Sequence, residues 1–125
     1  MNELIIDVPA DEWISQNARL HWARKARMTK ALRSRAFVLA RSQKLQVPTP
    51  VLVVAEIGYT KGGRADPDNA SPTVKACIDG IVSAGALPDD DSTHIVAITY
   101  QRGPKTDQKG VHRVHLKFIE QHVKF

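Results

Sequence analysis

Acidic residues gather in two short stretches whose spacing suits a bound metal ion. The first stretch is Arg64-Ala65-Asp66-Pro67-Asp68-Asn69, and the second is Pro88-Asp89-Asp90-Asp91-Ser92. In an extended segment, residues i and i+2 point to the same side, so Asp66 and Asp68 are expected to project together. Two close carboxylates repel each other unless a cation lies between them. Mg²⁺ is the natural cation because it prefers hard oxygen ligands and also binds waters and phosphates, and Mn²⁺ is expected to substitute for it.

The two acidic stretches meet only if the chain reverses its direction between them. The helix predicted between them has roughly fifteen residues and would span about 20–25 Å. A reversal after Gly85, followed by a returning strand, would bring Asp90 or Asp91 towards the first pair. We expect this convergence from chemistry, because a metal site that cleaves phosphodiesters commonly uses several carboxylates; the spacing alone does not predict it.

Other metal sites fit the sequence poorly. An EF-hand loop that began at Asp66 would need Gly at its sixth position and Glu at its twelfth, where the chain has Ser71 and Cys77. The five His residues and the single Cys show no paired spacing typical of zinc ligands. The remaining alternative is structural: a helix-entry turn at the first stretch and a solvated loop at the Asp triplet.

Positive charge is concentrated in one segment of this chain, whose net charge is +5. Residues 17–44 hold nine of the 18 Lys and Arg residues and no Asp or Glu. Such segregation of charge is typical of a surface that meets a polyanion, although a solvated helix face is the alternative. The nine residues are Arg19, Arg24, Lys25, Arg27, Lys30, Arg33, Arg35, Arg41 and Lys44.

Hydrophobic periodicity predicts the elements that must position these residues. Apolar Met28, Leu32 and Val38 or Leu39 recur at helical spacing, and Ser71 followed by Pro72 is typical of a helix start. Gly85 is expected to end that second helix. The predicted elements are a strand at 3–8, an irregular stretch at 9–22, a helix at 23–44, a strand at 51–60, a basic loop at 61–64, a helix from 71 to 85, and strands at 94–102 and 111–119.

The order β-α-β-α-β-β predicts an α+β fold, in which helices pack on a mixed sheet of about four strands. The 125 residues suit one domain, residues 1–125. In the last strand, Val114, Leu116 and Phe118 alternate with basic residues, which predicts one buried and one basic face. Cys77 stands alone among apolar neighbours and is expected to be a buried thiol. The chain has no apolar run long enough to cross a membrane and no pattern of a signal peptide, so we expect a cytoplasmic protein.

The acidic stretches and the helix between them resemble the RusA family of Holliday junction resolvases, especially its phage and prophage members. The family pattern is D-x-D-N, a helix with a Lys and an Asp-Gly or Asp-Ala pair, an Ala-Gly helix end, and a D-D loop, with Ser or another residue third, that leads into a strand. An N-x-R-x-H-W segment precedes the basic helix in the family. The matching residues are Asp66, Asp68, Asn69, Lys75, Asp79-Gly80, Ala84-Gly85, Asp90-Asp91-Ser92 and Asn17-Ala18-Arg19-Leu20-His21-Trp22.

The resemblance implies a homodimeric, Mg²⁺-dependent endonuclease that nicks opposite strands of a four-way DNA junction, in a bacterium or in a phage that infects one. It implies that Asp66, Asp68 and Asp91 or Asp90 bind metal, and that Lys75 is the catalytic lysine. Lys75 follows the D-x-D-N motif at a greater distance than in the family pattern, so its role is the less secure of these. The residues expected to contact DNA are Asn17, Arg19, His21, Arg24, Lys25, Arg27, Lys30 and Arg33.

Several alternatives stay open at this point. Trp22 either stacks on unpaired bases or packs in the core beneath the first helix. The enzyme is either a junction resolvase or a nuclease for flaps and other branched DNA. A DNA-binding protein without catalytic activity would use the same basic segment and keep its acids for structure.

Overall fold

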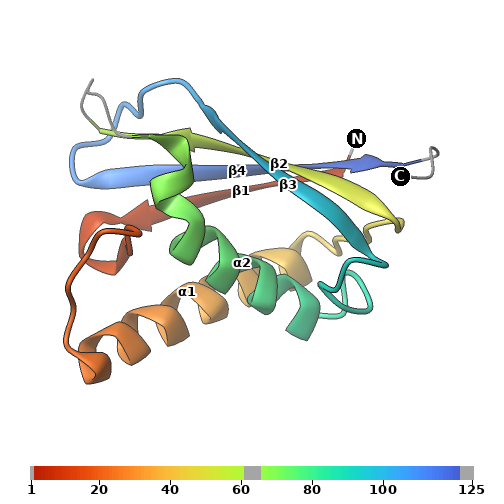
Figure 1. Ribbon diagram of the computed structural model, residues 1–125, viewed down its shortest axis with the longest axis horizontal. Helices are drawn as coiled ribbons and strands as arrows, with labels where there is room; N and C mark the ends of the chain where they lie inside the picture. Colours follow the sequence, from red (N-terminus) through yellow and green to blue (C-terminus); the bar gives the residue numbers. More distant parts are fainter. Residues whose placement is uncertain (1, 61–65, 122–125) are drawn as a thin grey trace.

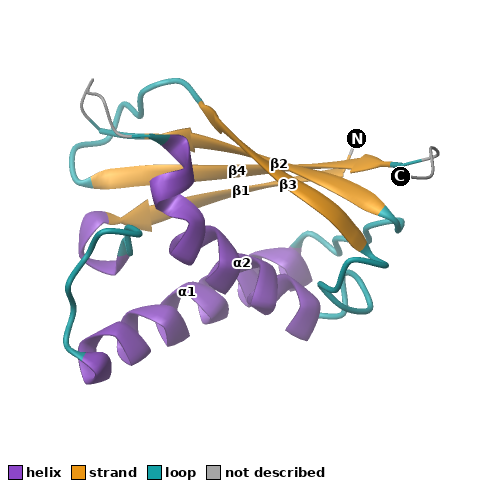
Figure 2. Cartoon of the chain, viewed as in Figure 1, coloured by secondary structure: helices purple, strands orange, loops and turns teal. Residues whose placement is uncertain are grey.

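Two helices cover one face of a four-stranded sheet in the computed structural model of this chain, which describes residues 2–60 and 66–121 (Figures 1 and 2). This arrangement confirms the predicted fold class. The basic loop expected at 61–64 lies outside the described residues. The elements are β1 (Asn2–Pro9), the 3-10 helix η1 (Ala10–Glu12), α1 (Trp22–Ser42), β2 (Val51–Gly58), the 3-10 helix η2 (Pro67–Ala70), α2 (Ser71–Ser83), β3 (Ile95–Arg102) and β4 (Val111–Glu120).

The sheet has the strand order β1-β4-β2-β3. The last strand, β4, lies between β1 and β2 and is antiparallel to both of them. In contrast, β2 and β3 are parallel, with Val51 opposite Ile95 and Ile57 opposite Arg102. Parallel neighbours need a long crossover connection, and here η2 and α2 provide it.

The core lies between the sheet and the two helices. On α1 the buried residues are Met28, Leu32, Ala36 and Ala40, which are spaced four residues apart. Of the two residues predicted as alternatives to continue this stripe, Leu39 is partly buried against the core, whereas Val38 is 61% exposed. The last two residues of the stripe, Ala36 and Ala40, are small and let α1 approach its neighbours closely.

A glycine sets the distance between α1 and α2. A Cβ atom on Gly80 would lie 2.2 Å from the carbonyl oxygen of Arg33 and 3.1 Å from the Cβ of Ala36. The helices can therefore be this close only where α2 has no side chain.

The end of α2 is confirmed at Gly85. Gly85 has a φ of +82°, a conformation that glycine adopts without strain. Its amide donates to the carbonyl of Val82, and the amide of Ala86 donates to that of Ile81. These two bonds form a Schellman motif, which satisfies carbonyls left free at the helix end.

The start of α2 differs from the prediction in two ways. Pro67–Ala70 forms a 3-10 helix, so Asp66 and Asp68 do not share an extended segment. Ser71 is the first residue of α2 and not its N-cap, which is Ala70 and contributes no side-chain hydrogen bond. Both corrections have one cause: the 3-10 turn runs directly into the helix and leaves no extended residue between them.

Two single residues test the remaining expectations. Trp22 begins α1 and is 77% exposed, which contradicts the alternative that it packs in the core. Cys77 is buried, as predicted, and burial raises the pKa of its thiol to about 12. Neither α1 nor α2 is long and apolar enough to cross a membrane, and they are the α-helices of the described part of the chain.

The sheet face opposite the helices carries ion pairs that span neighbouring strands. The basic residues predicted on the outer side of β4 do lie there, but each has an acidic partner. The pairs are Arg113 with Asp7 at 2.7 Å, His115 with Glu3 at 3.0 Å and Lys117 with Glu56 at 2.6 Å. Acids on β1 and β2 therefore offset the basic charge of this face.

Candidate functional site

The irregular segment after β1 is fixed to the first turn of α2 by one buried hydroxyl. Thr73 is fully buried, and its Oγ1 accepts a hydrogen bond from the amide of Ile14 at 2.9 Å. The same hydroxyl donates to the carbonyl of Ile14, also at 2.9 Å. The 3-10 turn and the helix that follows it thus have a defined neighbour from the N-terminal part of the chain.

The two halves of the sequence motif meet beside this anchor. The amide of Gln16 donates to the carbonyl of Asn69 at 2.7 Å. The side-chain amide of Asn17 lies 3.5 Å from Oδ1 of Asn69. The N-x-R-x-H-W segment therefore lies against the D-x-D-N segment, although the two are about fifty residues apart in sequence.

Asp66 and Asp68 are exposed; both lie near the phenol of Tyr59, just after β2, and Asp68 also lies near that of Tyr100 on β3. The pKa of Tyr59 is raised by burial first, and the carboxylates of Asp68 and Asp66 raise it further against the opposing effect of Arg102. Burial and then Asp68 likewise raise the pKa of Tyr100. Asp68 is therefore near both β3 and the end of β2.

Aromatic rings form the wall next to these carboxylates. Trp13, Tyr59 and His112 contact one another edge to face, with ring centroids 4.8–5.8 Å apart. The guanidinium of Arg102 lies 4.7 Å from the centre of the Tyr59 ring. Burial lowers the pKa of His112, and its Nδ1 is buried with no hydrogen-bond partner among the described residues.

Lys75 forms a second cluster, with two other aspartates. Its Nζ lies 3.0 Å from Asp79, one turn along α2, and also pairs with Asp90. The hydrogen bond between Lys75 and Asp90 is the main cause that lowers the pKa of Asp90 and raises that of Lys75. The chain therefore does reverse after Gly85, as expected, but Asp90 returns to Lys75.

Asp91 shapes the turn that leads into β3. Its Oδ1 accepts hydrogen bonds from the hydroxyl of Thr93 at 2.5 Å and the amide of Thr93 at 3.1 Å, and lies 2.8 Å from Nδ1 of His94. These bonds, with Thr93 foremost, lower the pKa of Asp91. The carboxylate at this position is thus ionised and already engaged with its neighbours.

Asp91 and the pair Asp66 and Asp68 lie towards opposite ends of the β2–β3 pair. The turn after Asp91 lies beside the start of β2, where the amide of Val51 donates to the carbonyl of His94. Asp66 and Asp68 follow the other end of β2, and eight residues of strand span about 25 Å. The structure brings both Asp66 and Asp68 near Tyr59 and Lys75 near Asp90, but it does not bring Asp91 to Asp66.

A cation could be held by the first pair. Within residues 2–60 and 66–121, no group of three or more His, Cys, Asp or Glu side chains is arranged to hold a metal ion. Mg²⁺ is commonly bound by one or two carboxylates, with water and substrate phosphate as its other ligands. Asp66 and Asp68, both exposed beside the amide of Asn69, fit that kind of site.

The residues expected to contact DNA form an exposed row that begins beside the first cluster. His21 caps α1, and its Nδ1 accepts a hydrogen bond from the amide of Ala23 at 3.2 Å. Arg35 pairs with Glu12 at 2.5 Å, and in the described part of the chain it is the one cation of α1 with an ion pair. The exposed members of the row are Asn17, Arg19, His21, Arg24, Lys25, Arg27, Lys30 and Arg33.

Several residues that shape the site could not be predicted from local sequence patterns. Thr73 bonds to a residue 59 positions away, and nothing local to the helix indicates such a partner. Arg102 and Tyr100 lie on a strand whose pairing with β2 depends on the sheet order.

A scan against protein-family models and a search of curated proteins found no match to this chain.

Proposed function

We propose that this protein is a metal-dependent endonuclease that cuts branched DNA, with the four-way junction as its first substrate. The observation that supports the proposal is the contact of Gln16 and Asn17 with Asn69. Because of this contact, the exposed basic row begins where the two exposed carboxylates lie. A DNA backbone held by the row would pass close to a pair of metal ligands.

Each group has a chemical task in this proposal. Asp66 and Asp68 hold the cation, which would lower the pKa of a bound water and offset charge on the scissile phosphate. Lys75 supplies a positive charge from the exposed side of α2, where its pairing with Asp79 and Asp90 keeps it protonated. That charge would stabilise the developing phosphate charge or protonate the leaving oxygen.

In this proposal, Asp90 and Asp91 position other groups and do not bind the metal in the single chain. Asp90 orients Lys75, and Asp91 holds the turn before β3. Either residue becomes a metal ligand only if its present hydrogen bonds break or a second copy of the chain brings it to the pair. A homodimer also suits the chemistry, because a junction has approximate two-fold symmetry and needs two cuts. We place this activity in the cytoplasm of a bacterium, where a phage protein would also act.

The test is cleavage of a labelled four-way junction beside a linear duplex and a flap, with Mg²⁺ or with EDTA. We expect paired symmetric nicks in the junction that need Mg²⁺ and are lost in Asp68→Asn. Asp107→Asn, which alters an exposed carboxylate in the turn between β3 and β4, is the matched control and should cleave like the wild type. Tight binding of the junction without cleavage in Mg²⁺ or Mn²⁺ would overturn the enzyme and leave a DNA-binding protein.

A further inference from the structure

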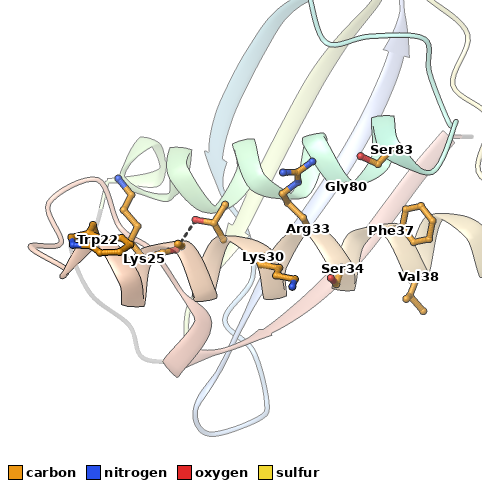
Figure 3. Close-up of a pocket in the computed structure, with 11 residues that line it drawn as sticks. Trp22, Lys25, Lys30, Arg33, Ser34, Phe37, Val38, Gly80 and Ser83 are labelled. Carbon is orange, nitrogen blue, oxygen red and sulfur yellow. Dashed lines mark hydrogen bonds between the residues drawn. The ribbon is translucent and has the colours of Figure 1, made fainter.

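The outer side of the helical layer carries a long groove between α1 and α2. It has a volume of about 910 Å³ and is open to solvent along α1 (Figure 3). Arg33 points from α1 towards α2 near Gly80, and Phe37 lies near Ser83 (Figure 3). Trp22 and Val38 mark the two ends of this surface, which we call the α1–α2 groove.

The groove exposes apolar side chains that the fold leaves uncovered. Trp22 is 77% exposed and Val38 is 61% exposed, the highest values among the exposed large apolar residues of the described chain. Phe37 is partly buried, and the guanidinium of Arg41 lies 5.1 Å from its ring centre. These side chains line a single groove, and apolar surface exposed along a groove is typical of a binding site.

The charge of the groove selects an anionic occupant. Lys25, Lys30 and Arg33 line it, and no acidic residue of the described chain does. A second copy docked groove to groove would bring like charges together, which costs several kcal/mol. The groove is therefore unsuited to self-association and suited to a polyanion.

We propose that the α1–α2 groove binds a single-stranded arm of the DNA substrate, an inference that rests on the proposed function. Single-stranded DNA offers phosphates to the three cations and base faces to the aromatic rings, the combination found in single-strand binding grooves. A duplex keeps its base faces stacked inside, so Trp22 and Phe37 would have nothing to stack on. From Trp22 to Phe37 the helix rises about 22 Å, enough for several nucleotides.

The groove also adjoins the residues of the proposed chemistry. Ser83, at its α2 edge, lies one turn beyond Asp79 on the same side of the helix, and Asp79 pairs with Lys75. At the other end, Trp22 follows the segment that contacts Asn69. A strand in the groove would thus lie between the proposed lysine and the DNA-contacting segment. The groove would then be filled by a junction, flap or fork in which an arm next to the cut has unpaired bases.

The experiment measures binding in EDTA, so that it does not depend on cleavage. Fluorescein-labelled oligo-dT, a duplex of equal length and an abasic strand of equal length are titrated with the wild type and with Trp22→Ala. Ile119→Ala, which removes an exposed apolar side chain of β4 away from the groove, is the matched control. Circular dichroism spectra verify that each variant is folded.

We expect Trp22→Ala to weaken oligo-dT binding about 5-fold to 150-fold, since each stacked base contributes about 1–3 kcal/mol. Duplex and abasic-strand affinities should change less than twofold, and Ile119→Ala should change none of the three. An equal effect on all three ligands, or no effect on oligo-dT, overturns the proposal. So does tighter binding of a synthetic acidic amphipathic peptide, which would indicate a protein partner. Junction cleavage is measured separately, so a failure of the groove leaves the nuclease proposal standing, and the reverse holds as well.

Discussion

At the scale of single residues, carboxylates of similar sequence context have different tasks. Asp66 and Asp68 are exposed beside two phenols, whereas Asp90 is bound to Lys75 and Asp91 to Thr93 and His94. The difference lies in the partners that the fold supplies. A carboxylate already satisfied by hydrogen bonds must lose them to take a cation, whereas an exposed carboxylate has only water to displace.

The buried ring of His112 makes the stability of the fold depend on pH. Burial lowers its pKa from the ordinary value of 6.5, so the folded protein binds a proton less readily than the unfolded chain. The stability that the uncharged His112 ring contributes to the folded protein is therefore fully present above about pH 6.5. This stability is lost as the pH falls through the pKa of His112 in the folded state. His112→Phe keeps a ring against Trp13 and Tyr59 but removes the titration.

The measurement is the free energy of unfolding in urea at pH 7.5 and pH 5.5. We expect the wild type to lose more stability between these two values than His112→Phe does, because only the wild type must leave His112 uncharged in the folded state. If both proteins lose the same amount, the pH dependence comes from other groups. Titration of the His112 ring by NMR gives the folded pKa directly.

At the scale of elements, the packing of α1 on α2 depends on residues that have no bulk. The buried alanines of α1 and Gly80 of α2 bring the two helices close together. Trp22 and Val38 are exposed residues of α1, and both line the groove together with Gly80 of α2.

Gly80→Ala tests this packing, because two effects of opposite sign act at this position. Alanine favours a helix interior over glycine by about 1 kcal/mol. The added Cβ would meet the backbone oxygen of Arg33, and overpacking of this kind typically costs about 1–3 kcal/mol. Because the clash is with backbone, we expect net destabilisation by up to about 2 kcal/mol, seen as a lower urea midpoint.

Ser83→Ala is the control for helix propensity, because Ser83 is an exposed residue of the same helix. It should leave stability unchanged or raise it by a few tenths of a kcal/mol. A Gly80→Ala protein more stable than the wild type would show that α1 moves aside at little cost, and that the glycine does not set the helix distance.

At the scale of the whole molecule, charge divides between the two layers. The helical layer carries the basic row on its exposed side, whereas the basic residues of β4 on the uncovered sheet face are paired with acids. A polyanion is therefore attracted to one side of the molecule. Binding through that side should depend strongly on salt, because each phosphate that is neutralised releases counterions.

This asymmetry predicts how two charge-removing variants differ. Arg27→Gln, in the exposed row, should reduce the slope of log K against log salt for duplex DNA by about one. Lys117→Gln, on the sheet face and paired with Glu56, should leave that slope unchanged. Fluorescence anisotropy at several salt concentrations gives both slopes. Equal slopes for the two variants would show that DNA does not select the helical side.

The sequence by itself determined the elements, their order and the residue types that carry the proposed chemistry. Periodicity gave the strands and both helices within about two residues, and Gly85 marked a helix end because only its backbone freedom suits that turn. These features are local: they depend on neighbours within a few positions, which a sequence displays directly. The burial of Cys77 followed in the same way from its apolar neighbours.

Tertiary structure alone decided which of these residues meet. The sheet order placed β3 beside β2 and parallel to it, which put Asp91 at the far end from Asp66. The hydroxyl of Thr73 fixed the N-terminal segment to α2 across 59 positions, and a 3-10 turn replaced the extended segment expected at Asp68. Contacts between distant segments depend on how the layers pack, and no local pattern of residue types specifies that packing.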